Sequence, residues 1–141
     1  MSLKHSLKRS CYNVMTRPDP QKIQRMLKQD AEDRSKAQQG EFFMANVQSS
    51  AGLIMRHPVL IVGKHNDSND NEDVIACLCT SQPKRSNYDL PAKLKEDSFV
   101  RTNKIYLLGR NQLIHKIRRH SVTPQEITNY IMSANTAIKI L

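Results

Sequence analysis

Arg56-His57-Pro58-Val59-Leu60-Ile61-Val62-Gly63 and Val74-Ile75-Ala76-Cys77-Leu78-Cys79-Thr80 are the two runs of sequence that decide the fold. Both are apolar, rich in β-branched residues and bounded by turn residues, a pattern that predicts strands. Their apolar residues are continuous rather than alternating, which predicts burial on both faces of a sheet. Polar side chains stand at the outer ends of these runs, where buried strands hold them in fixed positions, so candidate site residues are sought there first.

An acidic loop, residues 66–73, separates the two runs. Its carboxylates raise the question of calcium binding. The loop lacks the central glycine and the closing glutamate of the twelve-residue calcium loop. The sequence therefore predicts a solvated hairpin turn.

The composition indicates a basic, single-domain protein. The chain has 141 residues with 22 Lys and Arg against 13 Asp and Glu, a formal charge of +9. Such a charge favours polyanionic partners, of which nucleic acid is the commonest, although a basic protein without such a partner is the alternative. The absence of Trp and the few Phe and Tyr residues argue against an aromatic single-strand-binding sheet.

Cysteine usage and hydropathy indicate a reducing, aqueous compartment. There are three cysteines and no apolar run near the ~20 residues that a membrane span needs. We expect a cytoplasmic protein with no membrane association. Cys77 and Cys79 share one strand face and could form half of a metal site, but no second Cys or His pair has a matching spacing. Buried thiols are therefore the better interpretation, and no metal or cofactor is expected.

The N-terminal part reads as a basic extension. Residues 1–18 lack periodicity and are interpreted as a loose arm. Asp19-Pro20 then predicts a helix over residues 20–38, ended by Gly40. The apolar side of this helix is narrow, so it is either lightly docked or a solvated extension. We expect two parts, residues 1–39 as arm and helix and residues 40–141 as the main domain.

The main domain is expected to alternate strands with short connections. Residues 41–47 predict a strand, residues 87–92 an edge segment, and residues 98–108 a strand pair or one bent strand. The apolar loop Leu53 to Met55 is either tucked under the domain or reserved for another chain. After Gly109 a short amphipathic helix is expected, with Leu113, Ile114 and Ile117 on its apolar side. Thr123-Pro124-Gln125-Glu126 is a capping box that predicts an amphipathic C-terminal helix.

Four segments in order resemble one family. Gly40-Glu41-Phe42-Phe43 is similar to its "G-[DE]-[IV]-[YWF]" start, and residues 56–62 resemble its "R-P-V-L-V-[IV]" strand. Residues 74–81 resemble its "V-x-x-x-[IP]-[IL]-T-S" strand, and residues 98–117 resemble its following segment without gaps. On this basis, residues 40–141 resemble the MazF/PemK/Kid family of toxin endoribonucleases.

The resemblance implies a fold and an activity. The fold would be α+β, a small SH3-like β-barrel (MazF/Kid/CcdB-like) with a C-terminal amphipathic helix and, here, an N-terminal helical extension. The activity would be that of a toxin–antitoxin system: a homodimeric, metal-independent endoribonuclease that cleaves single-stranded RNA, with an antitoxin competing for the RNA groove. The gyrase-poison branch of this fold receives no specific support from the sequence.

The resemblance also points to catalytic residues. In the family an arginine before the proline and the threonine that ends the second strand form the active site. Thr80 matches, but His57 occupies the arginine position and Arg56 precedes it by one residue. Three interpretations of His57 follow. It is a proton shuttle beside Arg56, or the loss of the arginine marks a non-catalytic relative that binds RNA or protein. In the third, it is a strand-end histidine without a chemical role.

Further residues are expected to contact RNA. Arg101 stands where some members carry an active-site arginine, but the aspartate that follows two residues later in them is Asn103 here. Arg101 is therefore assigned to phosphate contact, with a solvated strand charge as the alternative. The other candidates for RNA binding are Ser81, Gln82, Lys84, Arg85 and Lys104.

Overall fold

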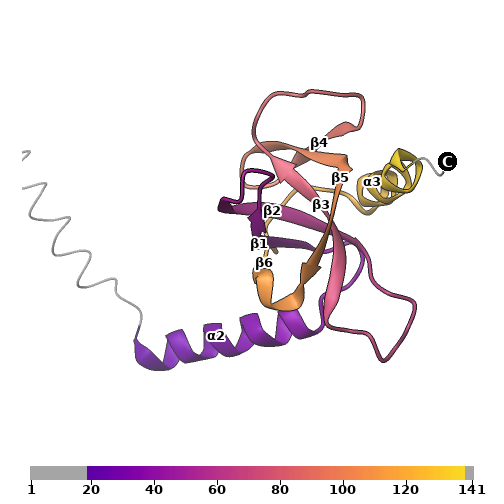
Figure 1. Ribbon diagram of the computed structural model, residues 1–141. Helices are drawn as coiled ribbons and strands as arrows, with labels where there is room; N and C mark the ends of the chain where they lie inside the picture. The colour runs from indigo at the N-terminus through magenta and orange to yellow at the C-terminus, as the bar shows by residue number, and fades with distance from the viewer. Residues whose placement is uncertain (1–18, 139–141) are drawn as a thin grey trace, which may run out of the picture.

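The structure is a computed structural model that describes residues 19–138, and its strands form one antiparallel sheet (Figure 1). The six strands lie in the order β4-β5-β3-β2-β1-β6. Their bounds are β1 Phe42–Gln48, β2 Ile54–Gly63, β3 Asp73–Thr80, β4 Asp89–Lys93, β5 Asp97–Gly109 and β6 Leu113–Lys116. Two helices, α2 (Pro20–Ser35) and α3 (Pro124–Ala137), complete an α+β fold.

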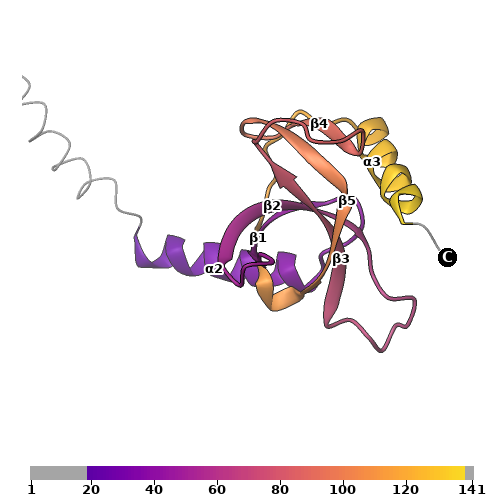
Figure 2. The same cartoon turned by 45° about the horizontal axis from the view of Figure 1, so that its top comes forward.

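The sheet curls strongly but its pairings do not close it. Figure 2 shows β2 following a strongly curved path. Strands β4 and β6 are the two ends of the order, and no pairing joins them within residues 19–138. The α+β class is confirmed, whereas the closed barrel implied by the family resemblance is not supported by the strand pairings.

The two deciding runs are strands β2 and β3, buried on both faces as predicted. Val59, Ile61 and Ala76 belong to one core cluster, on what we call the inner face of the sheet. Leu60 and Cys77 belong to a second cluster, on what we call the α3 face, because it also contains Tyr130 and Ala134 of helix α3. A strand with apolar side chains on both sides thus contributes to two cores at once.

The predicted buried thiols and the bent strand are also confirmed. Cys77 and Cys79 are both fully buried on the α3 face. Strand β5 is continuous, with Cys77 opposite Ile105 but Leu78 opposite Arg101, so three residues bulge out of the ladder. Within this bulge Thr102 donates to or accepts from Ser133 of α3 at 2.6 Å. The bulge therefore ties the bent strand to the helix.

One predicted helix is wrong. Residues after Gly109 form a single 3₁₀ turn, Arg110–Gln112, followed by strand β6 rather than an amphipathic helix. Strand β6 pairs with the free edge of β1, for example Phe43 with Lys116. Leu113 packs in the inner core and Ile117 packs against the other cluster, so the apolar residues serve two faces of a sheet. Pairing with a free strand edge overrode a short and ambiguous helical pattern.

Helix α2 begins as predicted and ends earlier. Asp19 caps it by accepting from the amide of Lys22 at 2.7 Å. The helix ends at Ser35, and Gly40, with φ of 92°, makes the turn into β1 instead of ending the helix. Figure 1 shows the helix reaching beyond the sheet. It has no buried residue, and Asp33 and Arg34 near its C-terminal end contact Arg118 and Ile114.

Helix α3 has the predicted capping box. Thr123 accepts from the amide of Glu126, whose carboxylate accepts from the amide of Thr123. Tyr130 and Ala134 are its buried residues, and the hydroxyl of Tyr130 donates to the carbonyl of Pro91 on the edge strand. The helix is thereby fixed on the α3 face.

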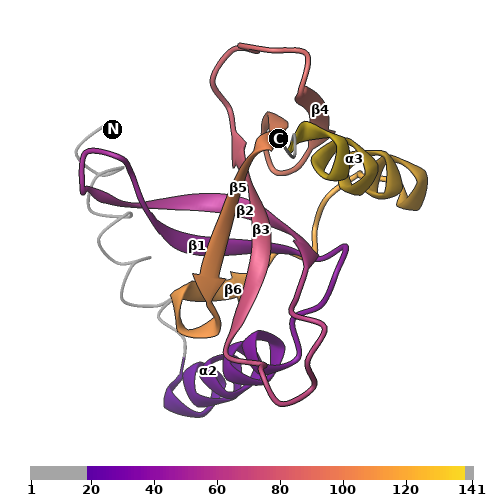
Figure 3. The same ribbon diagram turned by 45° about the vertical axis from the view of Figure 1, so that its right-hand side comes forward.

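The apolar loop is not tucked under the sheet. Leu53, Ile54 and Met55 are 63%, 70% and 50% exposed at the tip of the β1–β2 hairpin, which projects from the sheet in Figure 3. The acidic loop between β2 and β3 is a largely exposed hairpin connection, as predicted. No helix within residues 19–138 is long and apolar enough to cross a membrane.

Candidate active site

His57 lies within β2 and Thr80 ends β3. Val59 lies opposite Leu78 in this antiparallel pair, and continuing the register by two residues places His57 opposite Thr80. Directly opposite residues share a face of the sheet, with Cβ atoms about 4.5–5.5 Å apart. Both side chains are partly buried, as expected at the rim of a core.

His57 lies at the border of the inner core. It pairs with Ala45 on β1 and shares its face with Val59, both of which are buried in that core. Burial lowers the pKa of His57 below its usual value of 6.5 because the charged imidazolium loses solvation. The imidazole is therefore neutral at physiological pH and able to accept a proton.

The Thr80 hydroxyl is oriented by the turn that follows the strand. Its Oγ1 accepts a hydrogen bond from the amide of Gln82 at 3.1 Å. It donates to no acceptor in the part of the chain that the structure describes, so its proton can be given to a ligand. Phe99 on β5 lies directly opposite Thr80 and extends the same row across the sheet.

Arg56 faces the other way. It pairs with Asn46 on β1, next to the His57–Ala45 pair. Successive residues of a strand point to opposite faces, so Arg56 lies on the face opposite to His57 and Thr80. Its side chain is exposed. Of the two candidates for the arginine position, the structure brings His57 and not Arg56 to Thr80.

Arg101 belongs to the same face as the pair. It lies opposite Leu78, which is two residues before Thr80 on β3 and therefore on the same face. Only 6% of Arg101 is exposed, and its Nε has no hydrogen-bond partner within residues 19–138. An arginine cannot lose its charge in a protein, and a buried charge without full pairing is costly. Because it is buried, this side chain is not a solvated strand charge.

Asp89 is a neighbour that sequence reasoning missed. It lies opposite Arg101 on the edge strand β4 and is 1% exposed. Its Oδ2 accepts from the amide of Arg85 at 2.8 Å, which fixes the turn between residues 85 and 89. The sequence offered no signal for it, because an isolated aspartate next to a short edge strand reads as a turn residue.

The remaining candidates lie around this face; of them, Gln82 contacts it through its backbone amide, which donates to Thr80. Ser81, Gln82, Lys84 and Arg85 are exposed in the loop that leaves Thr80, and Lys104 is exposed in the bulge of β5. No ion pair of residues 19–138 involves the five basic candidates, which are Arg56, Lys84, Arg85, Arg101 and Lys104. Cations without internal counter-ions are available to phosphates.

Comparison with known families decides the identity. A family model described as "PemK-like, MazF-like toxin of type II toxin-antitoxin system" matches residues 38–132. The chain belongs to this family of toxins. This match spans the whole sheet and most of α3, so the resemblance seen in the four sequence segments is confirmed.

Solved structures support the fold of this MazF-like toxin. The "Mycobacterium tuberculosis toxin MazF-mt6" superposes with a TM-score of 0.53 at 14% identity, covering 69% of this chain and 94% of that chain. An "Endoribonuclease in complex with its cognate antitoxin from Mycobacterial species" gives a TM-score of 0.56 at 19% identity, covering 71% and 92%. A search of curated proteins gave no match. At these identities the likeness concerns the fold, and the chemistry depends on the residues described above.

Proposed function

We propose that this MazF-like toxin is an endoribonuclease that cleaves single-stranded RNA, with His57 as its proton acceptor. The proposal is supported by the register of β2 and β3, which sets His57 opposite Thr80 when continued two residues beyond the Val59–Leu78 pair, with the buried cation of Arg101 on the same face. A base, a hydroxyl donor and a guanidinium are the groups that attack on a phosphodiester requires. The family to which the chain belongs is one of toxins, and cleavage of RNA is the activity that the resemblance implies.

The proposed reaction uses the RNA as its own nucleophile. Neutral His57 takes the proton from the ribose 2′-hydroxyl, and the 2′ oxygen attacks the adjacent phosphorus. The bond from phosphorus to the 5′ oxygen breaks, and that oxygen takes a proton from water. The products are a 2′,3′-cyclic phosphate and a 5′-hydroxyl. Arg101 and the hydroxyl of Thr80 donate to the phosphate oxygens as negative charge builds on them.

The surrounding basic side chains are proposed to hold the RNA backbone. Lys84 and Arg85 leave the site on the loop after Thr80, with Ser81 and Gln82 as hydrogen-bonding groups in the same loop. Lys104 is proposed to contact the backbone from the bulge. These contacts position the RNA without reading its sequence. The N-terminal residues 1–39 are proposed to be a separate extension of the toxin domain.

We also propose a homodimer that an antitoxin neutralises. The related mycobacterial endoribonuclease was solved with its cognate antitoxin, and the present chain belongs to a family of toxins from such pairs. The exposed residues Leu53, Ile54 and Met55 form an apolar tip of the kind that a second chain covers. Co-expression with an acidic partner encoded beside the toxin tests the antitoxin assignment by relief of growth arrest.

The decisive experiment incubates tag-free protein with a long single-stranded RNA in the presence of EDTA. The wild type is expected to give discrete fragments with 5′-hydroxyl ends, detected because polynucleotide kinase labels them without prior phosphatase treatment. His57→Ala and Thr80→Ala are expected to abolish these fragments. Arg56→Ala is the matched control, since its side chain lies on the opposite face.

Two results would change the proposal. Intact RNA from pH 6 to pH 8 with salt-dependent binding retained would establish the alternative, a non-catalytic module that binds RNA or protein. Cleavage that survives His57→Ala but is lost in Arg56→Ala would keep the nuclease and transfer the role to the arginine.

A further inference from the structure

The backbone next to Arg101 leaves the strand ladder. Leu78 of β3 pairs with Arg101, but the preceding residue, Cys77, pairs with Ile105, so residues 102–104 of β5 have no partner on β3. On the other side of β5, the pair of Arg101 with Asp89 is the last before the bulge. Residues beyond the end of a ladder lose the hydrogen bonds that hold a regular strand in place. Other contacts must therefore fix the direction in which the Arg101 side chain leaves the strand.

Thr102 makes these contacts. Its amide donates to the carbonyl of Tyr88 at 3.0 Å, and its hydroxyl donates to the same carbonyl at 2.7 Å. The thiol of Cys77 donates to the carbonyl of Thr102 at 3.8 Å, and Thr102 is 0% exposed. The planar peptide group that carries the Thr102 amide begins at the Cα atom of Arg101. A fixed amide at residue 102 therefore sets the direction of the Arg101 side chain.

The donor and acceptor of each hydrogen bond in this network can be assigned. A hydroxyl group carries one proton and can accept two hydrogen bonds. The proton of the Thr102 hydroxyl goes to the carbonyl of Tyr88, which can only accept. Oγ1 of Thr102 and Oγ of Ser133 are 2.6 Å apart, so Ser133 is the donor of this second bond. The hydroxyl of Ser133 on α3 thus holds Thr102 in one rotamer.

The carbonyl of Tyr88 also connects the bulge to the strand edge opposite Arg101. Tyr88 directly precedes Asp89, the residue that pairs with Arg101. The amides of Tyr88 and Asp89 donate to the hydroxyl and the carbonyl of Ser86, each at 3.1 Å. The start of β4, the bulge of β5 and helix α3 are therefore joined at one buried threonine, Thr102.

We propose that Ser133 is a positioning residue of the ribonuclease site, a role that rests on the proposed function, in which Arg101 contacts the phosphate. Ser133 donates to Thr102, Thr102 fixes the peptide group that follows Arg101, and the guanidinium is thereby held on the face of His57 and Thr80. Ser133 itself contacts neither the RNA nor the reacting atoms. A group held by such supporting hydrogen bonds loses less freedom when the substrate binds.

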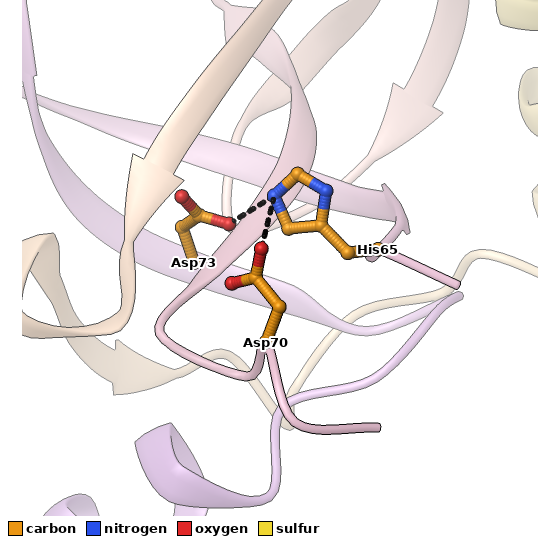
Figure 4. Close-up of side chains that lie close together, drawn as sticks. All are labelled: His65, Asp70 and Asp73. Carbon is orange, nitrogen blue, oxygen red and sulfur yellow. Dashed lines mark ion pairs between the residues drawn. The ribbon is translucent and has the colours of Figure 1, made fainter. Parts of the chain in front are cut away.

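A contact at the far end of β3 provides a control for effects on stability alone. His65 follows β2, and its Nε2 atom is 2.6 Å from Oδ1 of Asp73 and 4.0 Å from Oδ2 of Asp70 (Figure 4). Asp73 begins β3, whereas Thr80 ends it. The variant His65→Gln therefore removes a contact between strand ends without touching the face that carries Arg101.

The test measures single-turnover cleavage of a long single-stranded RNA by the full-length protein. Ser133→Ala is expected to lower the rate by roughly three- to tenfold, because a displacement of about 1 Å can cost about 10²-fold and this bond restrains the bulge only in part. Ser133→Thr keeps the hydroxyl and is expected to restore a rate near that of the wild type. Thr128→Ala is the matched control on α3, where the Thr128 hydroxyl donates to the carbonyl of Pro124 in its own helix.

A double-variant cycle distinguishes positioning from loss of stability. If Ser133 acts through Arg101, adding Ser133→Ala to the Arg101→Met protein is expected to cause no further loss of rate. His65→Gln is expected to change the rate by the same factor with and without the arginine. Equal fold losses from Ser133→Ala in both backgrounds would overturn the proposal, as would a Ser133→Thr protein as slow as Ser133→Ala.

The wild-type protein separates the failure of this role from the failure of the proposed function. An active wild type with an equally active Ser133→Ala variant would overturn the positioning role and leave the nuclease standing. A wild type that leaves the RNA intact would overturn the proposed function and the role of Ser133 with it.

Discussion

The pKa of His57 determines how the rate of the proposed cleavage depends on pH. Burial lowers the pKa of His57 below 6.5, and the neutral form is the proton acceptor. The cleavage rate should therefore rise with pH along an acid limb whose midpoint lies below 6.5 and should level off above it. Single-turnover rates measured from pH 4.5 to pH 8 would show this limb.

A variant separates this titration from unfolding in acid. His57→Gln should have a low rate without the acid limb. Stability depends on pH in the same direction. Below pH 6.5 the unfolded chain protonates His57 more readily than the folded state does, so the free energy of unfolding falls as the pH drops. A limb with its midpoint above 6.5, or one that persists in His57→Gln, would contradict the assignment of His57 as the base.

The burial of Arg101 predicts that replacing it has opposite effects on stability and on cleavage. It is 6% exposed, and its Nε has no partner within residues 19–138. Arg101→Met removes a buried charge at similar length, so the thermal midpoint should stay the same or rise. Cleavage should fall by roughly 10²-fold or more, because a donor to the developing phosphate charge is lost. Calorimetric scans and single-turnover rates on the same preparation measure both effects.

A clear fall in the midpoint of Arg101→Met would assign Arg101 a different role. Asp89 lies opposite it and is 1% exposed. In that case Arg101 would be the counter-charge of Asp89. The double variant with Arg101→Met and Asp89→Asn should then have a higher thermal midpoint than Arg101→Met alone. The proposed phosphate contact would then lose its main support.

Among the elements, Arg110 is one of the residues that join helix α2 to the sheet, beside the Arg34–Ile114 and Asp33–Arg118 contacts. The Nη1 atom of Arg110 donates to the carbonyls of Arg34 at 2.9 Å and Ala37 at 3.0 Å, while its other nitrogens hold Asn71 in the β2–β3 loop. Arg110→Lys keeps the charge but loses the planar fork. It should lower the free energy of unfolding by about 1–3 kcal/mol, as several carbonyls lose their donors. Urea denaturation, with exposed Arg119→Lys as control, measures the change, and a shift equal to that of the control would show that α2 docks by other contacts.

We expect two chains to associate through the exposed apolar tip of the β1–β2 hairpin. Ile54 is 70% exposed at its tip, so Ile54→Glu should change the thermal midpoint very little. It should convert the proposed dimer to a monomer, because a carboxylate in an apolar interface loses its solvation. Light scattering after size exclusion gives the mass, and Met132→Glu on α3, at a residue 60% exposed, is the control. A dimer lost in Met132→Glu and kept in Ile54→Glu would place the interface on α3.

The elements also show what a sequence can predict. Strands β2 and β3, the cap of α2 and the capping box of α3 follow from local signals, namely continuous β-branched runs and N-cap chemistry. The sequence of strand β6 predicts a helix, because its role as a strand depends on the free edge of β1, a partner about 70 residues earlier in the chain. Asp89 and the face of Arg56 depend on strand register in the same way. Local signals such as helix caps can be read from the sequence, whereas the neighbours of a residue across a sheet depend on strand pairing.

For the whole molecule, the charge of +9 predicts strongly salt-dependent RNA binding. Each phosphate neutralised on a single strand contributes about −0.7 to the slope of log K against log salt. If Lys84, Arg85, Arg101 and Lys104 each bind one phosphate, the slope should be near −3. Fluorescence anisotropy with the cleavage-deficient Thr80→Ala protein between 50 and 300 mM KCl measures it.

Single variants then locate the charges that matter. Lys84→Ala and Lys104→Ala, each in the Thr80→Ala background, should make the slope about 0.7 less negative. Lys64→Ala should leave it unchanged, because Lys64 lies just past the opposite end of β2. Equal losses at Lys64 and Lys84 would mean that RNA responds to the overall charge, and the proposed path of the RNA backbone across the His57–Thr80 face would be wrong.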